Sequence, residues 1–334
     1  MKAKGKGMRN CAAWVTLAAL WLGANPPATA QTGWTPRGAV EIASNCAPGC
    51  GPDRTARTFQ KIWQEGRMFD AAITVGNRPG GGGIILYNQL NQRADGQMIA
   101  IASGSLITNH IVGLGPSHNE LTPLARLFGE YIAVAVRADS PIKSGRDLIE
   151  VLKKDPGALS IGVATSLGNS NHQGVARALR VSGIDVRKAK AVVFNSGANA
   201  IVAMLGGHVD IVPGSVGLWV PHLQSGSNVR LVAVAAPMRL PGLMAAIPTW
   251  REQGVNAVVS NWRGIVGPRN MDPEHVAFWE GALRKAVATE AWKKELQQFL
   301  LMDEFITTAE FRKYLDEQHI EIKELLVDLG LAKN

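Results

Sequence analysis

Short apolar runs alternate with amphipathic segments along most of the chain. Eight runs rich in β-branched residues predict strands, over 39–43, 71–75, 97–102, 131–136, 159–163, 191–194, 209–213 and 229–235. Between them, apolar residues that recur every three or four positions predict helices, over 54–64, 83–91, 144–153, 172–181 and 199–206. Strands and helices that alternate at this spacing indicate mainly parallel sheets with helices on both faces.

The carboxyl end has a different pattern. From Pro273 to Leu331 the chain is predicted to be nearly all helix, in segments that begin near Pro273, Thr289 and Thr307. The total of 334 residues corresponds to about two domains of ordinary size. We therefore expect an α/β protein of two parts with a helical C-terminus.

The amino end has the composition of an export signal. Four basic residues within positions 2–9 precede an apolar run over 11–23 and the small-residue sequence Ala28-Thr29-Ala30. This order is typical of a secretory signal peptide, and the apolar run is shorter than the roughly 20 residues of a membrane span. We predict that residues 1–30 are a signal peptide cleaved near Ala30 and that the mature protein is periplasmic.

The net charge bears on the class of ligand. The whole chain has Lys+Arg 35 against Asp+Glu 27, a formal charge of +8. Removal of residues 1–30 takes away four basic residues and no acidic one, which leaves +4. This mild charge and the scattered basic residues do not indicate nucleic-acid binding, but they suit attraction of small anions.

Three loops follow predicted strands and precede predicted helices, which is where parallel α/β sheets bind ligands. The first, 47–53, is rich in glycine and proline, and its backbone N–H groups could face an anion at a helix N-terminus. The alternative is an ordinary turn with Asp53 as the capping acid. The second, 77–83, lacks the residues of a phosphate-binding loop or a dinucleotide fingerprint. The third, 165–172, has more hydroxyl and amide groups than capping needs, which indicates a hydrogen-bonding wall.

Several motifs together carry a resemblance to a known family. They are the loop before Asp53-Arg54-Thr55-Ala56-Arg57, Asn77-Arg78-Pro79-Gly80-Gly81-Gly82-Gly83, Asp95-Gly96, the Ser/Asn loop ending in His172, Leu205-Gly206-Gly207-His208-Val209-Asp210, Ile247-Pro248-Thr249-Trp250 and Gln253-Gly254. In order and spacing, from about Trp34 to Leu331, the chain resembles the extracytoplasmic solute-binding proteins of tripartite tricarboxylate transporters, also called the Bug family.

The resemblance implies a two-lobed periplasmic-binding-protein fold, type II-like, in which a small carboxylate-bearing solute is captured between the lobes. We expect lobe 1 to comprise residues 31–129 and 249–334, and lobe 2 residues 130–248. The implied partner is an integral-membrane permease or a sensor kinase, and we expect a monomer. The resemblance implies no catalysis and no cofactor.

The ligand-binding residues implied by the resemblance and the loops lie mainly in the three loops and near the lobe junction. They are Pro48, Gly49, Cys50, Gly51, Asp53, Arg78, Gly81, Gly82, Ser166, Asn169, Ser170, Asn171, Ser215, Trp262 and Arg263. Arg78 or Arg263 could pair with a second ligand carboxylate, although a surface position is the favoured interpretation of Arg263. Trp262 could pack on the ligand or in the core. Asp53 could cap its helix, order water or contact a ligand ammonium group.

Two features leave other chemistry open. Cys46 and Cys50 are the cysteines that remain after removal of the signal peptide, and an oxidising periplasm favours a disulfide between them. A metal site is the rival, but two cysteines without nearby histidines are a poor ligand set. His172 lies near Ser166 and Ser170, so a Ser/His hydrolase is the enzymatic alternative, although no G-x-S-x-G elbow is present. The pattern favours a binding protein over an enzyme, with a ligand sensor for a signalling partner as a further alternative.

Overall fold

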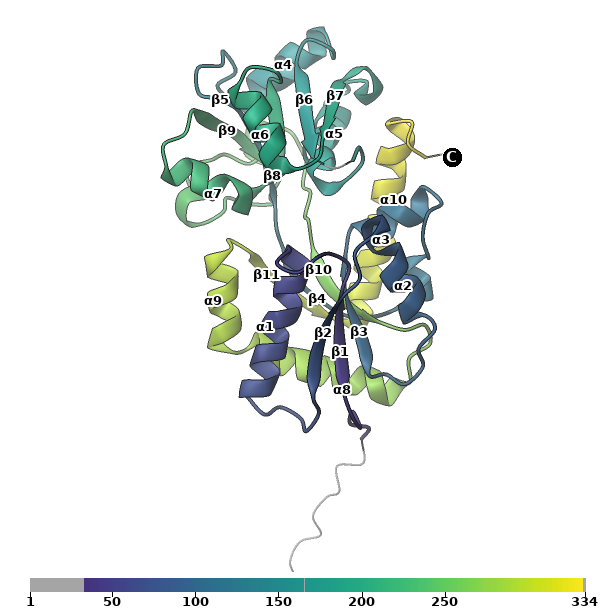
Figure 1. Cartoon of the computed structure of the whole chain (residues 1–334). Helices are drawn as coiled ribbons and strands as arrows, with labels where there is room; N and C mark the ends of the chain where they lie inside the picture. The colour runs from purple at the N-terminus through teal and green to yellow at the C-terminus, as the bar shows by residue number, and fades with distance from the viewer. Residues whose placement is uncertain (1–32, 165, 333–334) are drawn as a thin grey trace, which may run out of the picture. The chain divides into compact units, whose positions relative to one another are not determined.

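The computed structural model describes residues 33–164 and 166–332 (Figure 1). The predicted signal peptide lies outside these residues. The described chain forms two β-sheets with flanking helices. We call the six-stranded sheet and the helices packed on it lobe 1, and the five-stranded sheet with its helices lobe 2. No described helix is both long and apolar enough to cross a membrane.

The sheet of lobe 1 has the strand order β11-β4-β10-β3-β1-β2. Its strands are β1 (Val40–Ser44), β2 (Ile73–Asn77), β3 (Met98–Ser103), β4 (Thr122–Gly129), β10 (Arg263–Gly267) and β11 (Met302–Thr307). β1 pairs in parallel with β2 and β3, whereas β10 is antiparallel to β3 and β4, and β11 is antiparallel to β4. Four strands therefore point one way, and β10 and β11 point the other.

The sheet of lobe 2 has the order β7-β6-β8-β5-β9. Its strands are β5 (Ile132–Arg137), β6 (Ser160–Ala164), β7 (Lys190–Phe194), β8 (Ile211–Ser215) and β9 (Val229–Val234). β6 is parallel to β7 and β8, and β5 is antiparallel to both β8 and β9. Only β5 opposes the common direction, so the prediction of mainly parallel strand directions in each lobe is confirmed.

Helices cover both faces of each sheet. They are α1 (Gly51–Glu65), α2 (Ile84–Leu90), α3 (Ser105–Ile111), α4 (Gly145–Lys154), α5 (Ser170–Val181), α6 (Gly197–Leu205), α7 (Val216–Gln224), α8 (Pro273–Val287), α9 (Glu290–Gln298) and α10 (Thr308–Asp328). Short 3₁₀ turns are η1 (Gly81–Gly83), η2 (His118–Glu120), η3 (Val186–Lys188), η4 (Gly242–Met244) and η5 (Arg251–Gln253).

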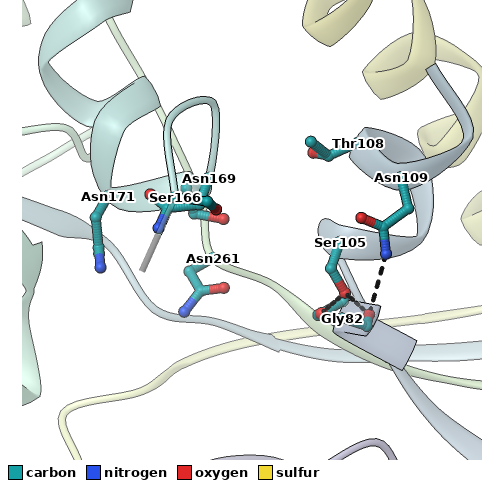
Figure 2. A pocket seen from close by; sticks show the side chains of 10 residues that line it. Gly82, Ser105, Thr108, Asn109, Ser166, Asn169, Asn171 and Asn261 are labelled. Atoms are coloured by element: carbon teal, nitrogen blue, oxygen red, sulfur yellow. Dashed lines mark hydrogen bonds between the residues drawn. The ribbon is translucent and has the colours of Figure 1, made fainter. Parts of the chain in front are cut away.

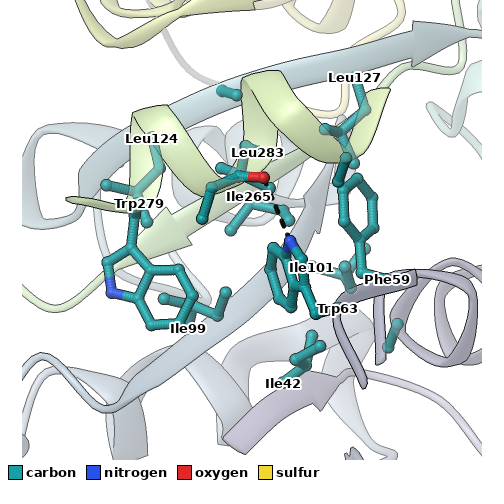
Figure 3. Close-up of a cluster of buried hydrophobic side chains, with 14 of the residues drawn as sticks. Ile42, Phe59, Trp63, Ile99, Ile101, Leu124, Leu127, Ile265, Trp279 and Leu283 are labelled. Carbon is teal, nitrogen blue, oxygen red and sulfur yellow. Dashed lines mark hydrogen bonds between the residues drawn. The ribbon is translucent and has the colours of Figure 1, made fainter. Parts of the chain in front are cut away.

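Successive side chains of β3 pack in cores on opposite faces of the lobe 1 sheet. Ile99 and Ile101 belong to a core with residues of α1, α8 and α9, and Figure 3 shows Trp63 and Trp279 in this cluster. Ala100 and Ala102 pack on the other face, with residues of α2, α3 and α10. Because successive side chains of a strand point to opposite faces, both faces need apolar cover. The strands consequently appear in the sequence as nearly continuous apolar runs.

The chain crosses between the lobes at two adjacent places. The first is Glu130, between β4 and β5, and the second is the segment 260–261 before β10. The N–H of Asn261 donates to the Glu130 carbonyl at 2.7 Å. Residues 249–259 pack with lobe 2: Trp250, Val255 and Val259 belong to its core. We therefore propose that lobe 2 extends to residue 259, beyond the boundary at 248 expected from the sequence.

The carboxyl end contains the three predicted helices, α8, α9 and α10, and one strand that was not predicted. The expectation of a nearly all-helical end was wrong for Met302–Thr307, which forms β11 at the edge of the lobe 1 sheet. The other strands and α-helices that the apolar pattern did not predict are β4, β10, α3 and α7.

Candidate functional site

A cavity of about 440 Å³ lies between residues of the two lobes. Figure 2 shows its two walls, with Ser105, Thr108 and Asn109 on one side and Ser166 and Asn171 on the other. The lining residues are Gly82, Ser103, Ser105, Thr108, Asn109, Ser166, Asn169, Ser170, Asn171 and Asn261. Each of these is a glycine or carries a neutral hydroxyl or amide. The site can therefore form many hydrogen bonds but has no charged side chain in its lining.

The lobe 1 wall is built from the glycine turn η1 and the helix α3. All four glycines from Gly80 to Gly83 have positive φ, a conformation that side chains rarely adopt. Side chains of α3 hold the turn: Ser105 Oγ donates to Gly82 O at 2.8 Å and Asn109 Nδ2 donates to Gly81 O at 2.9 Å. The turn and the first part of α3 therefore form one hydrogen-bonded unit.

The lobe 2 wall is the loop that enters α5. Asn169 is the N-cap, and its Oδ1 accepts the His172 N–H at 2.9 Å. Nδ1 of His172 accepts the Gly168 N–H at 2.9 Å, and Gln173 Nε2 donates to Gly168 O at 2.7 Å. His172 is 4% exposed, and burial lowers its pKa to about 4. The imidazole is therefore neutral near pH 7 and organises the loop.

Asn261 connects the cavity to Arg263 at the place where the chain crosses. Its Oδ1 accepts from Arg263 Nη1 at 2.9 Å, and its Nδ2 donates to Glu130 Oε2 at 3.2 Å. Arg263 is partly buried and lies beside the N-terminus of α1, since a Cβ on Gly51 would lie 3.7 Å from Nη2. Burial lowers the pKa of Arg263, but a guanidinium remains charged at neutral pH. Among the described residues, no carboxylate lies within 4.0 Å of it.

Five of the sequence-predicted residues line the cavity: Gly82, Ser166, Asn169, Ser170 and Asn171. Gly81 is next to this group and supplies a carbonyl to Asn109. Ser215 is the N-cap of α7 in lobe 2 and does not line the cavity. Trp262 is 1% exposed and packs edge-on against Phe311, with ring centroids 5.5 Å apart. The structure therefore places Trp262 in the core of lobe 1.

The first glycine-rich loop is closed by a disulfide and does not line the cavity. The structure joins Cys46 and Cys50 by a disulfide, with Cα atoms 6.3 Å apart. Pro48 and Gly49 lie inside this closed loop, and Cys50 is the N-cap of α1, which begins at Gly51.

Asp53 has three protein partners and is 1% exposed. Its carboxylate accepts from Gly49 N at 2.8 Å, from Arg57 Nε at 2.9 Å and from Asn77 Nδ2 at 2.9 Å. Burial raises the pKa of Asp53, but the hydrogen bonds from Arg57, Gly49 and Asn77 outweigh burial, so the net pKa is below its ordinary value. The contacts favour the reading of Asp53 as an acid that fixes the loop.

Arg78 is paired within lobe 1. Its Nη1 donates to Glu41 Oε1 at 2.6 Å, and its Nε donates to the side chain of Gln89. The partner acid lies on the neighbouring strand β1, so Arg78 is less available to a ligand than Arg263.

Half of the lining residues were not among the residues predicted from the sequence: Ser103, Ser105, Thr108, Asn109 and Asn261. The first four lie at or after the carboxyl end of β3, where Gly104 alone separates the strand from α3. The rule that located the other loops applies to this junction as well, because the strand over 97–102 was predicted.

The described residues contain no group of three or more His, Cys, Asp or Glu side chains placed to hold a metal ion. The Nδ1 atom of His172 is occupied by a backbone N–H, and no hydrogen bond joins His172 to Ser166 or Ser170 in the described structure. This geometry gives no support to the Ser/His hydrolase alternative.

Two α/β lobes that contribute opposite walls to one polar cavity define a two-lobed solute-binding protein. The chain matches the model of the tripartite tricarboxylate transporter family receptor over residues 62–331, and it belongs to this family. The resemblance to solute-binding proteins of these transporters is thereby confirmed.

Individual relatives agree with this assignment. The chain is 25% identical over 320 residues to the UPF0065 protein in the gbd 5' region of Cupriavidus necator, covering 95% of this chain and 94% of the relative. A TctC solute-binding protein from Polaromonas, without ligand, has a TM-score of 0.76 at 23% identity, over 88% of this chain and 99% of that one. A Rhodopseudomonas palustris protein with adipate has a TM-score of 0.74 at 20% identity, over 89% and 99%. These likenesses confirm the two-lobed fold.

Proposed function

We propose that this chain is a periplasmic receptor that binds a small carboxylate-bearing solute between its lobes and delivers it to a membrane permease. The observation that carries the proposal is the position of Arg263, a partly buried cation without a carboxylate partner in the described structure, held by the cavity residue Asn261. The family assignment and the adipate in a structural relative support the same class of ligand. Catalysis has no role in this proposal.

The proposed anion site combines two sources of positive potential. The guanidinium of Arg263 can form two parallel hydrogen bonds to a carboxylate. The N-terminus of α1, a helix of 15 residues, adds its unsatisfied N–H groups and the positive end of the helix dipole at Gly51. The remainder of the solute then lies in the neutral cavity, where both lobes form hydrogen bonds to it.

The lobes are proposed to move about the crossings at Glu130 and Asn261 when solute binds, since these are the places where the chain passes from one sheet to the other. The permease would recognise the form in which both walls contact the solute. Export to the periplasm with cleavage near Ala30 and a monomeric state complete the proposal.

Thermal unfolding in the presence of matched ligands tests the proposal that the protein binds a carboxylate. Succinate is compared with succinamide, which has the same carbon chain but no charge. A bound diacid at about 100 times its Kd is expected to stabilise the fold by about 2.7 kcal/mol. Arg263→Gln should weaken diacid binding at least tenfold, whereas Arg269→Gln, which removes an exposed arginine on the same lobe, should leave it unchanged. If neither succinate nor any other di- or tricarboxylate stabilises the protein, the proposal is refuted.

A further inference from the structure

The side chains that form the lobe 1 wall of the cavity donate their polar hydrogens to other groups of the protein. Ser105 Oγ donates to Gly82 O, so in the pair of hydroxyls at 3.0 Å Ser103 Oγ is the donor and Ser105 Oγ the acceptor. A hydroxyl has one hydrogen to donate and two lone pairs. Both serines therefore retain lone pairs toward a ligand and no hydrogen.

Thr108 and Asn109 also donate their side-chain hydrogens to protein carbonyls and retain lone pairs only. Thr108 Oγ1 donates to Gly104 O at 3.2 Å. Asn109 Nδ2 donates to two carbonyls, Gly81 O at 2.9 Å and Gly82 O at 3.3 Å. These contacts fix the orientation of the amide, because a flipped amide would place Oδ1 against two carbonyl oxygens. Figure 2 shows Oδ1 of Asn109 on the side of the cavity.

The opposite wall differs. The side chains of Ser166, Ser170 and Asn171 form no hydrogen bonds within the described structure, so they retain hydrogens for a ligand oxygen. The cavity therefore has one wall whose side chains can donate and one wall, with four side chains on β3 and α3, whose side chains only accept. A ligand carboxylate, which also only accepts, is unfavourable against the accepting wall.

From this arrangement we infer that the receptor selects carboxylates that carry hydroxyl groups on their carbon chain, with Ser103, Ser105, Thr108 and Asn109 as the residues that recognise the hydroxyls. This inference rests on the proposed function, because it assumes that the ligand is a carboxylate. A plain aliphatic diacid leaves the accepting wall without donors and costs the desolvation of its oxygens.

An ammonium group would also donate to this wall, but the structure favours a neutral donor. No carboxylate lines the cavity among the described residues. Glu130, which accepts from the cavity residue Asn261, is offset by the charge of Arg263, and Asp53 has three protein partners. Moving an ammonium from water into a site with no counter-charge is much more costly than moving a hydroxyl. Hydroxy acids are therefore favoured over amino acids.

The test uses ligands that share a carbon skeleton. Titration calorimetry compares succinate, malate and aspartate, which have four carbons and differ at one position in H, OH or NH₃⁺. Adipate and galactarate form a second pair at six carbons. For at least one of the two chain lengths, the hydroxylated acid is expected to bind at least about tenfold more tightly than the plain diacid. Malate is expected to bind more tightly than aspartate.

Two variants test whether these side chains recognise the hydroxyl group of the ligand. Thr108→Val and Ser103→Ala each remove an accepting oxygen with little change of shape. At least one of them should lower the preference for the hydroxylated acid about threefold or more, while the Kd of the plain diacid falls or stays the same, because this ligand no longer desolvates the removed oxygen. Thr74→Val is the matched control, because Thr74 Oγ1 also donates to a backbone carbonyl at 3.2 Å but lies on β2 outside the cavity. It should change neither value.

The possible results distinguish a failure of the inference from a failure of the proposed function. Plain diacids that bind as tightly as hydroxylated ones, aspartate that binds more tightly than malate, or a preference that survives both variants would each overturn the inference and leave carboxylate capture intact. If none of these carboxylates binds, both are overturned.

Discussion

The backbone N–H of Gly168 donates to Nδ1 of His172 at 2.9 Å, within the loop that forms one wall of the cavity. The acceptor must be unprotonated for this bond to exist, so the proton of the neutral imidazole is on Nε2. Gly168 itself has φ +78°, and a Cβ there would lie 2.7 Å from Leu326 of α10. One buried histidine and one glycine together set the path of the loop before α5.

This bond makes stability depend on pH. The pKa of His172 is about 4 in the folded protein, against an ordinary value of 6.5, because the side chain is buried. The unfolded chain therefore binds a proton first as the pH falls. The contribution of His172 is fully present above pH 6.5 and is lost progressively down to pH 4, by about 3 kcal/mol in total.

Urea unfolding between pH 7.5 and pH 4.5 measures this loss. His172→Asn supplies an amide oxygen for the Gly168 N–H but no titrating group, so its stability should fall less over this range than that of the unchanged protein. His208→Asn, at an exposed position, controls for the removal of a histidine. Equal pH dependence in the His172 variant and the unchanged protein would contradict the assignment.

A second prediction concerns the glycine turn of lobe 1. Gly82 and Gly113 both have positive φ, of 64° and 78°, so alanine at either position is strained by about 1–2 kcal/mol. A Cβ on Gly82 would lie 2.9 Å from Asn109 Nδ2, whereas one on Gly113 would meet nothing within 4 Å. Both variants should lose similar stability from backbone strain, but only Gly82→Ala should also weaken ligand binding, about tenfold. Calorimetry and urea unfolding on the two proteins compare these effects, and equal binding by both would show that the turn does not shape the site.

The sequence predicted the five strands of lobe 2 and β1, β2 and β3 of lobe 1 because each appears as a short apolar run, and most of them are buried on both faces. It did not predict α3, whose sequence SLITNHI combines β-branched residues with Ser, Thr and Asn, all weak helix formers. Tertiary packing of Leu106 and Ile107 in the core of lobe 1 stabilises this helix instead. Three cavity residues were missed with it. The strand β11 was missed because two acidic residues interrupt its sequence MDEFIT, so no apolar run marks it between the two helices.

Charged side chains were the hardest part of the site to predict. Whether an arginine is available to a ligand depends on acids far away in sequence, and Arg78 is paired with Glu41 from the next strand of the sheet. Arg263 has Asn261 beside it instead. Both arginines were candidates from the sequence, which favoured a surface position for Arg263, and only their neighbours in the fold distinguish them.

The bridge between Cys46 and Cys50 gives a third prediction. It closes a loop of a few residues before α1, which Asn77 also fixes by donating to the Cys46 carbonyl at 3.0 Å. Closure of so short a loop is worth about 2 kcal/mol. Reductant should therefore lower the melting temperature of the unchanged protein and not that of the Cys46→Ser/Cys50→Ser double variant. Intact mass after alkylation without reductant should show no added label, and two labelled thiols in periplasmic protein would contradict the bridge.

The last prediction concerns the link between the lobes through α10. This helix packs on β4 and α3 of lobe 1, and its Glu321 accepts from Arg177 of the lobe 2 helix α5 at 2.9 Å. A second arginine of α5, Arg180, pairs with Glu324 at 3.2 Å and with Asp328. Because α5 begins with the cavity residues Ser170 and Asn171, these pairs hold that wall in register with lobe 1.

A double-mutant cycle on Arg177 and Glu321 measures the link. The two side chains are 30% and 42% exposed, so the pair is worth less than about 1 kcal/mol. Arg177→Glu and Glu321→Arg should each destabilise the protein and speed amide exchange in the first turns of α5, and the double variant should recover most of both losses. The control is the pair Lys313–Glu317, which lies wholly within α10, at 3.9 Å. Its reversal should leave exchange in α5 unchanged. Strictly additive single effects would show that the ion pair does not couple the lobes, and a real coupling should shrink in 0.5 M NaCl because salt screens partly exposed charges.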